Sequence, residues 1–507
     1  MTRVLAIAAA LGVAIVATAA FAVTRPDPAA QARLDGCNRT ISAQLAQQAP
    51  EWVFVGDHDA PASGPPPPPQ WAKGTLPATH PSFLAVHPTQ ADSPTSHDSY
   101  DVLLNILPDA PYASLLGGDP SARTGNFEGD DEETGRLHSE LEQNAFPPFA
   151  WPEQGDRVEI LGNWIWDCGH WTPGGERTEF HPFRALWVDR GVSPRSPYGE
   201  AEGDVLITTD ATPAGKQEVC AHKTKGDPAA FKACLATEPD WQDVNGTYRF
   251  TLAAPPRPSP GARLLVRVVD AGSTPGAPAV TAKPAGQGAT VAVTVSEPAG
   301  KRVVIAKEVF VGWSPLPAAA LPDHLHLTFT QLLVRRAQDP GCPNAQPGCA
   351  SVESTREQQI SSPPGEWAVY SDVAGIWSSW APPVLKPSDG QTLRLGRTVD
   401  FYVGRRSPWR LFVFARECDF GTLSASDPNR PPAPCPKSGE FGDSAGDDSP
   451  GSVVDRFRTP AGSLGVHATD ATRETSSCPA ANARGCYRLT YAVTRVDDAS
   501  ARAKARR

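Results

Sequence analysis

The sequence predicts a mainly β protein made of antiparallel β-sandwich domains with disulfides, proline-rich loops and few short helices. Three observations lead to this fold class. Many short segments are rich in β-branched and aromatic residues and alternate apolar with polar side chains, the period of a half-buried strand. The chain of 507 residues contains 54 prolines and 43 glycines, so turns are frequent and long helices are few. It also contains ten cysteines, an even number that fits a disulfide framework.

The chain begins with the pattern of an export signal. Arg3 precedes an uncharged run, rich in alanine and valine, that extends over residues 4–23 and includes Ala20-Phe21-Ala22. This pattern predicts a signal peptide over residues 1–22. The run is also long enough to span a bilayer, so an uncleaved N-terminal anchor is the alternative. We expect a secreted or extracytoplasmic protein that contacts a membrane only if this segment is uncleaved.

The cysteine spacing agrees with an oxidising compartment. None of the cysteines forms C-x-x-C, which argues against zinc ribbons and thioredoxin-type sites. Cys37 and Cys168 are left after pairing neighbours, and a bridge between them would tie the N-terminal segment to the central region. Cys168 beside His170 could instead be a nucleophile, but the even count favours a disulfide. The pairs close in sequence are Cys220 with Cys234, Cys342 with Cys349, Cys418 with Cys435, and Cys478 with Cys486.

Composition divides the chain into segments, and five consecutive prolines mark one spacer. The net charge of −10 and the pI of about 5.6 argue against a nucleic-acid partner. The chain has no Walker loop, H-E-x-x-H motif or EF-hand spacing, so nucleotide-dependent chemistry and zincin proteolysis are unsupported. The expected segments are a signal peptide (1–22), a proline-rich N-terminal segment (23–95), a domain with a central hairpin (96–245), a β-rich middle region (246–340), a C-terminal β-sandwich (341–500) and a basic tail (501–507).

Residues 155–188 form the most chemically dense stretch and predict a β-hairpin. Residues 158–166 and 177–188 have strand composition, and Pro173-Gly174-Gly175 supplies the turn. A turn centred on Gly174-Gly175 places His170 opposite Glu179 and Cys168 opposite His181. A slip of one residue would reverse these facings.

Imidazole and carboxylate groups on one hairpin face suit Zn²⁺ or Mn²⁺, and an open coordination position could activate water. The candidate ligands are His170, Glu179 and His181, and Asp167 or Glu140 is the candidate general base. A buried polar network that pins a tryptophan-rich hairpin is the alternative explanation of the same residues. Nearby residues that could join the site are His97, Asp98, Asp101, His138 and Glu142.

A resemblance accompanies this stretch. The run G-N-W-I-W-D-C-G-H-W, followed by G-E-R-T-E-F-H-P, resembles a signature of uncharacterised secreted bacterial proteins with W-I-x-D-C-G-H and T-E-I-H-P. Phe180 stands where the signature has isoleucine. The upstream L-H-S-E-L-E-Q (137–143) and P-x-x-G-D-R-V (152–158) belong to the same pattern. The resemblance covers about a third of the chain and implies a secreted, β-rich protein with no established activity.

The C-terminal half repeats the strand pattern. Residues 247–252, 264–269, 290–295, 302–311 and 324–334 predict strands separated by turns. His324 and His326 share one face of the last strand, where a ligand pair or a plain polar face would fit. The run E-W-x-V-Y-x-D-V-x-G-x-W, over residues 366–377, is similar to C2-like modules and implies a C-terminal sandwich. The further expected strands are 367–371, 393–403, 409–416, 453–457 and 487–496.

One C-terminal loop matches a catalytic motif in letters only. Ser444 stands in G-x-S-x-G, but a proline-rich loop precedes it and acidic residues follow, whereas an esterase elbow needs a strand and then a helix. Asp443, Asp447 and Asp448 instead suit Ca²⁺, which takes oxygen ligands from loops. A solvated loop without an ion is the alternative.

Two functions follow from these patterns. The first is a non-catalytic exported protein whose sandwiches bind a cell-wall polymer, a glycan or another protein. The second is a metal-dependent hydrolase that uses the central hairpin. Metal content and the shape of the hairpin face would separate them.

Overall fold

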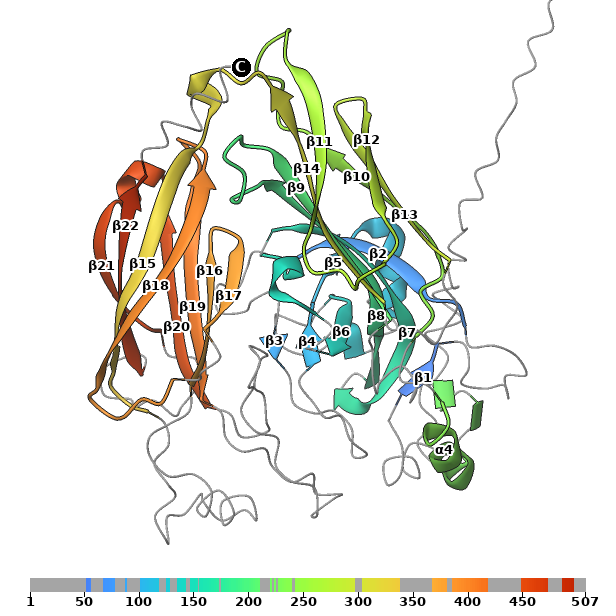
Figure 1. The fold of residues 1–507 in the computed structure, drawn as a ribbon. Coiled ribbons are helices and arrows are strands. Elements are labelled where there is room, and N and C mark those ends of the chain that lie inside the picture. Colours follow the sequence, from blue (N-terminus) through green and yellow to red (C-terminus); the bar gives the residue numbers. More distant parts are fainter. Residues whose placement is uncertain are drawn as a thin grey trace, which may run out of the picture.

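The computed structural model confirms a mainly β fold with antiparallel sheets (Figure 1). In the part of the chain that it describes, no helix is long and apolar enough to cross a membrane. The expected signal segment lies outside that part. The described residues are 52–55, 67–77, 87–88, 101–117, 125–127, 135–142, 146–153, 155–172, 175–209, 219–220, 223–224, 227–238, 242–296, 303–337, 367–380, 385–417, 448–472 and 486–496.

The predicted hairpin is the centre of an 11-stranded sheet. Its two strands are β7 (Arg157–Thr172) and β8 (Gly175–Val192), which pair along most of their length. The other strands of this sheet are β1 (Trp52–Phe54), β2 (Gln70–Thr75), β3 (His87–Pro88), β4 (Asp101–Leu103), β5 (Leu107–Pro108), β6 (His138–Glu142), β9 (Ala201–Thr208), β11 (Arg263–Asp270) and β14 (Val304–Ser314).

One edge of β8 is shared by two partners. Strand β6 pairs with residues 179–180 in parallel, and β9 pairs antiparallel with residues 185–192. Pro182 lies between these two ladders, where a residue without an N–H group removes no ladder hydrogen bond. Gln242 donates from Nε2 to the Phe183 carbonyl at 3.1 Å and so satisfies the backbone in the gap. The change of partner brings β6 beside the histidine-rich end of the hairpin.

A second layer covers one face of this sheet. It consists of β10 (Gly246–Ala253), β13 (Gly288–Val295) and β12 (Val280–Ala285), in that order. Trp187 of β8 stacks on Phe250 of β10 with ring centroids 5.0 Å apart and planes 5° from parallel. Gly203 makes this stack fit, because a Cβ there would lie 2.1 Å from the Trp187 ring. The stacked rings therefore join the two layers.

The C-terminal strands form a sandwich of two four-stranded sheets with its own core. The predicted strand alternation is clear in β15, where leucines point inward and the two histidines are half-buried. One sheet contains β15 (Asp323–Val334), β18 (Thr392–Val403), β21 (Gly465–Asp470) and β22 (Tyr487–Arg495). The other contains β16 (Trp367–Val373), β17 (Ile376–Ser379), β19 (Trp409–Glu417) and β20 (Asp448–Phe457).

The expected middle region supplies strands to three parts of the molecule. Strands β11 and β14 complete the large sheet, β10, β12 and β13 form the covering layer, and β15 enters the sandwich. The large sheet and the sandwich share a core, in which Trp151 packs against Tyr370 and Trp377 with centroids 6.3 and 5.7 Å away. The two parts therefore meet through aromatic side chains.

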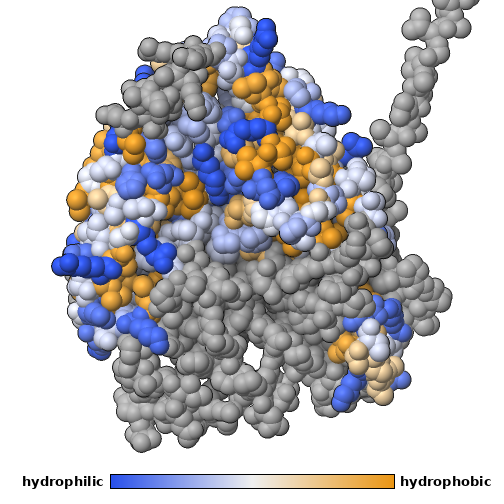
Figure 2. Space-filling view, viewed as in Figure 1, coloured by the Kyte–Doolittle hydropathy of each residue, from blue (hydrophilic) through white to orange (hydrophobic). Residues whose placement is uncertain are grey.

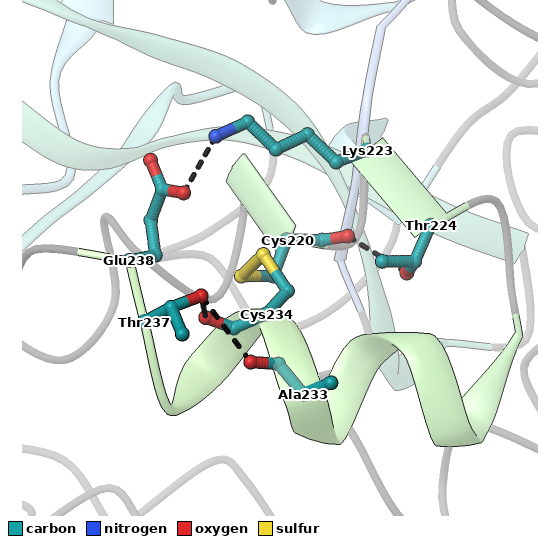
Figure 3. Close-up of a disulfide and its surroundings, with 7 residues drawn as sticks. All are labelled: Cys220, Lys223, Thr224, Ala233, Cys234, Thr237 and Glu238. Carbon is teal, nitrogen blue, oxygen red and sulfur yellow. Dashed lines mark hydrogen bonds and ion pairs between the residues drawn. A yellow bond between two sulfur atoms is a disulfide. The ribbon is translucent and has the colours of Figure 1, made fainter.

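The predicted bridge between Cys220 and Cys234 is present (Figure 3). It closes a short segment that contains α4 (Pro228–Leu235), and Asp227 caps this helix by accepting from two backbone N–H groups. Lys223 and Glu238 form an ion pair of 2.5 Å beside the bridge. Cys486 is also disulfide-bonded, and the other predicted pairs fall outside the described residues or on side chains that are not described.

The visible surface mixes hydrophilic and hydrophobic residues (Figure 2). Hydrophobic patches lie where β11 crosses this face, and Leu265, Val268 and Val269 of that strand are exposed. Arg267 lies among them, with its guanidinium 3.5 Å from the Phe310 ring centroid. A charge in the middle of an edge strand disfavours pairing with another sheet.

Candidate metal centre

The parallel pair of β6 and β8 brings two histidines and two glutamates to one face of the sheet. His138 lies opposite Glu179 in the register, and side chains two residues apart share a face. Glu140 and His181 therefore lie on the same face as this pair. Phe180 points to the opposite face and is part of the large hydrophobic core, which fixes the direction of its neighbours.

The side chains of this cluster contact one another through hydrogen bonds and ion pairs. His138 Nε2 is 2.6 Å from Glu140 Oε1, and His181 Nε2 is 3.5 Å from Glu140 Oε2. His181 Nδ1 is 3.6 Å from Glu179 Oε1. One ligand atom each of His138, Glu140 and Glu179 falls within 4.8 Å of the others. Atoms about 2 Å from one tetrahedral ion are separated by roughly 3.3 Å, so small side-chain adjustments would complete the geometry.

All four side chains are buried. His138 and Glu140 are 3% and 2% exposed, and Glu179 and His181 are both 0% exposed. Two buried carboxylates are costly unless they are paired with cations or coordinate a metal. The burial therefore favours compensation at this place, by protonated imidazole, by a bound ion or by protonation of a carboxyl group.

Amide side chains hold the group in place. His138 Nδ1 is 2.7 Å from Asn105 Oδ1, which orients the ring so that Nε2 faces Glu140. Metal-binding histidines are commonly oriented in this way through their second nitrogen. Asn126 holds the strand itself, because its side chain donates to the Thr178 carbonyl at 2.7 Å and accepts from the Thr178 N–H at 2.8 Å. Both backbone polar groups of Thr178, the residue before Glu179, are therefore held by Asn126.

The predicted site residues are only partly placed by the structure. Glu140, Glu179 and His181 come together with His138, which sequence reasoning had named as a neighbour and not as a ligand. The missed signal is the spacing H-x-E in β6, which puts His138 and Glu140 on one strand face.

The register predicted for the hairpin is wrong. Glu179 pairs with Ile165 and not with His170, and Asp167 pairs with Arg177. The cause is an irregularity between Asp167 and Thr172, which adds residues to β7 near the turn. The side chains of Asp167 and His170 are outside what the structure describes, so their relation to the site remains a prediction.

The remaining candidates are scattered. His97, Asp98, Asp443 and Asp447, together with Ser444, lie outside the described residues. Asp101 pairs with Glu142 in the backbone register of β4 and β6, and Asp448 pairs with Glu417, but the side chains of Asp101, Glu142 and Asp448 are not described. His324 and His326 both approach Asp400 Oδ1, at 3.4 and 2.9 Å, on a half-exposed face.

A second cluster of acidic side chains lies in the same sheet, and arginines balance its negative charge. Glu202, Asp204 and Glu308 place ligand atoms within 4.8 Å of one another. Arg190 Nε binds Asp204, and Arg195 binds Glu202 and lies 3.6 Å from Glu308. Burial raises the pKa of Asp204, and the ion pair with Arg190 opposes this shift. Because guanidinium groups already occupy it, this group is a poor site for a metal ion.

Comparison with known proteins does not assign the chain to a family. No family model matches the sequence, and no curated protein matches it. One solved structure, human GIVD cytosolic phospholipase A2, aligns with 86% of this chain and 33% of its own length at 9% identity. The TM-score of 0.18 is too low for this likeness to indicate fold or function.

Proposed function

We propose that the chain is an exported, non-catalytic β-sheet protein in which a Zn²⁺ or Mn²⁺ ion joins β6 to the hairpin strand β8. The ligands are His138, Glu140, Glu179 and His181. The observation that carries this proposal is the convergence of two imidazoles and two carboxylates, all nearly inaccessible to solvent, across a short parallel strand pair.

Burial favours a structural ion over a catalytic one. A catalytic zinc keeps one coordination position open to water or substrate, whereas a structural site is closed by four protein ligands. His138, Glu140 and Glu179 place ligand atoms within 4.8 Å of one another, and His181 Nε2 lies 3.5 Å from Glu140 Oε2. Together they would supply four nitrogen and oxygen donors, of the kind that zinc and manganese accept. The metal-dependent hydrolase, with Glu140 or Asp167 as base, would need such an opening and is therefore the second choice.

The ion would hold a weakly paired segment in place. Among the described residues, strand β6 pairs with β8 at two register positions, His138 with Glu179 and Ser139 with Phe180. Strands β4 and β3 are attached to the sheet through β6. An ion with ligands from both β6 and β8 would link the two strands, and through β6 it would hold β4 and β3 to the sheet.

The extracytoplasmic location rests on two features. Residues 1–22 have the pattern of a signal peptide, and the Cys220–Cys234 bridge fits an oxidising compartment. The partner class of this proposal is a cell-wall polymer, a glycan or another protein bound by sandwich loops. The net charge of −10 weighs against nucleic acid.

Metal content of the purified chain tests the proposal. We expect one zinc or manganese ion per chain by elemental analysis when the protein is purified without chelator. His181→Ala should lower this content at least tenfold, because one ligand is lost. His326→Ala is the matched control, since this half-buried histidine lies on β15, outside the proposed site, and it should retain the full content.

Two outcomes would overturn parts of the proposal. Equal metal content in His181→Ala and wild type would exclude the ligand set. Loss of metal that abolishes a hydrolytic activity without altering the protection of β6 against hydrogen exchange would favour the hydrolase over the structural role.

A further inference from the structure

The contact between the large sheet and the C-terminal sandwich contains a cluster of carboxyl groups. Glu153 follows Trp151 in the chain and reaches the β16–β17 turn, because a Cβ on Gly375 would lie 3.4 Å from Glu153 Oε1. Asp372 lies at the same turn and accepts from the Gly375 N–H at 2.7 Å. The two carboxyl groups therefore meet at Gly375 from opposite sides of the contact.

The charges around this pair do not balance. On the sandwich side, Arg410 Nη2 is 2.9 Å from Asp372 Oδ2. On the sheet side, Asp156 accepts from the Glu153 N–H at 2.7 Å and lies 3.5 Å from Arg190.

Arg190 also binds the buried Asp204. Two arginines, Arg410 and Arg190, thus face four carboxyl groups, which belong to Glu153, Asp156, Asp372 and Asp204. Asp189, one residue before Arg190, adds further negative charge near Asp156.

We propose that Glu153 and Asp372 share one proton across this contact, so that the sandwich is held tightly to the large sheet in acid and is released as the pH rises. A protonated carboxyl donates to a neighbouring carboxylate and removes the repulsion between them. When the proton leaves, two anions face each other at a buried turn beside the aromatic packing of Trp151 on Trp377.

The acidity of the buried groups agrees with this assignment. Burial raises the pKa of Glu153 well above its usual value, and the charge of Asp372 adds to the shift, while Arg410 opposes it. Burial also raises the pKa of Asp156 to about 6, against the effect of Arg190. A raised carboxyl pKa means that the closed form binds the proton more tightly than the open form. Its stabilisation is complete below the ordinary glutamate pKa of about 4.3 and is lost as the pH rises through the raised value.

Hydrogen exchange of the full chain tests the proposal. The readout is the protection of residues 367–377, with peptides from β10 and β13 as an internal reference for the intrinsic pH dependence of exchange. In wild type, the relative protection should fall about tenfold or more between pH 5.5 and pH 8.5, because each unit of pKa displacement changes the opening equilibrium tenfold. Glu153→Gln keeps a donor facing Asp372 without a titrating proton at this position, so its protection should fall clearly less than that of wild type over the same range.

The control is Glu159→Gln, which removes a carboxylate that pairs with the exposed Lys73 on the same sheet. It should follow the wild-type pH dependence. Protection in wild type that is independent of pH would overturn the proposal, whatever the variants do. A Glu153→Gln protein that loses protection in parallel with wild type would also overturn it. If Glu153→Gln does not fold, Asp372→Asn should flatten the same dependence.

Discussion

The large sheet buries two clusters of acidic side chains, and the two clusters differ in the kind of side chain that can balance their negative charge. Glu202, Asp204 and Glu308 are neutralised by Arg190 and Arg195, which are part of the chain. Glu140 and Glu179 instead contact imidazoles, a side-chain type that commonly binds metals. The first cluster is therefore a permanent part of the fold, whereas the stability of the second cluster depends on whether a cation is present.

Removing an arginine should have the largest effect. Arg190→Met leaves Asp204 buried without its cation and also removes hydrogen bonds to the carbonyls of Phe149 and Trp151. We expect a loss of about 3–5 kcal/mol in the free energy of unfolding, measured by chemical denaturation, because an unpaired buried charge remains. Lys73→Met, which breaks an exposed pair with Glu159, should cost about 1 kcal/mol or less. Equal losses of unfolding free energy in the two variants would mean that the buried ion pairs contribute no more to stability than the pair of Lys73 with Glu159.

Zinc should affect only the second group. At a concentration 100 times the Kd, zinc should stabilise the wild type by about 2.7 kcal/mol, measured by denaturation with and without chelator. The Lys73→Met control should gain the same amount, and Glu179→Gln should gain nothing, since a ligand is lost. A gain in Glu179→Gln equal to that of wild type would place the zinc elsewhere.

The smallest effect should come from the residue that orients a ligand. Asn105→Ala removes the contact to His138 Nδ1 without touching a proposed ligand atom. We expect the zinc affinity to fall about 10- to 100-fold, or roughly 1.4–2.7 kcal/mol, by calorimetric titration. Unchanged affinity would show that packing alone fixes the ring.

Strands with clear alternation were predictable from the sequence, and one strand with buried acidic residues was not. β10 and β15 alternate and match their predicted ranges closely. β9 was missed, because Glu202 and Asp204 make it look polar, although every residue of the strand is buried. The arginines that satisfy these acids come from β8 and from the loop that follows it, and only the fold brings them together.

The sequence predicted which residue types form the candidate site, but not which strands pair to bring them together. The sequence placed Glu179 and His181 on one strand face, because their spacing is two. It could not show that β6 lies parallel to β8, since that pairing depends on the point where β8 changes partner. The number of extra residues in β7 near the turn was also hidden, so the predicted opposition of His170 and Glu179 failed.

The fit of Trp187 over Gly203 has a consequence for how this sequence can vary. Only a hydrogen atom fits beneath the indole at position 203, because a methyl group would overlap the ring. Glycine there and tryptophan at position 187 should therefore change together or not at all as related chains diverge. Chains with a larger residue at 203 should carry a smaller one at 187 and should have lost the stack on Phe250.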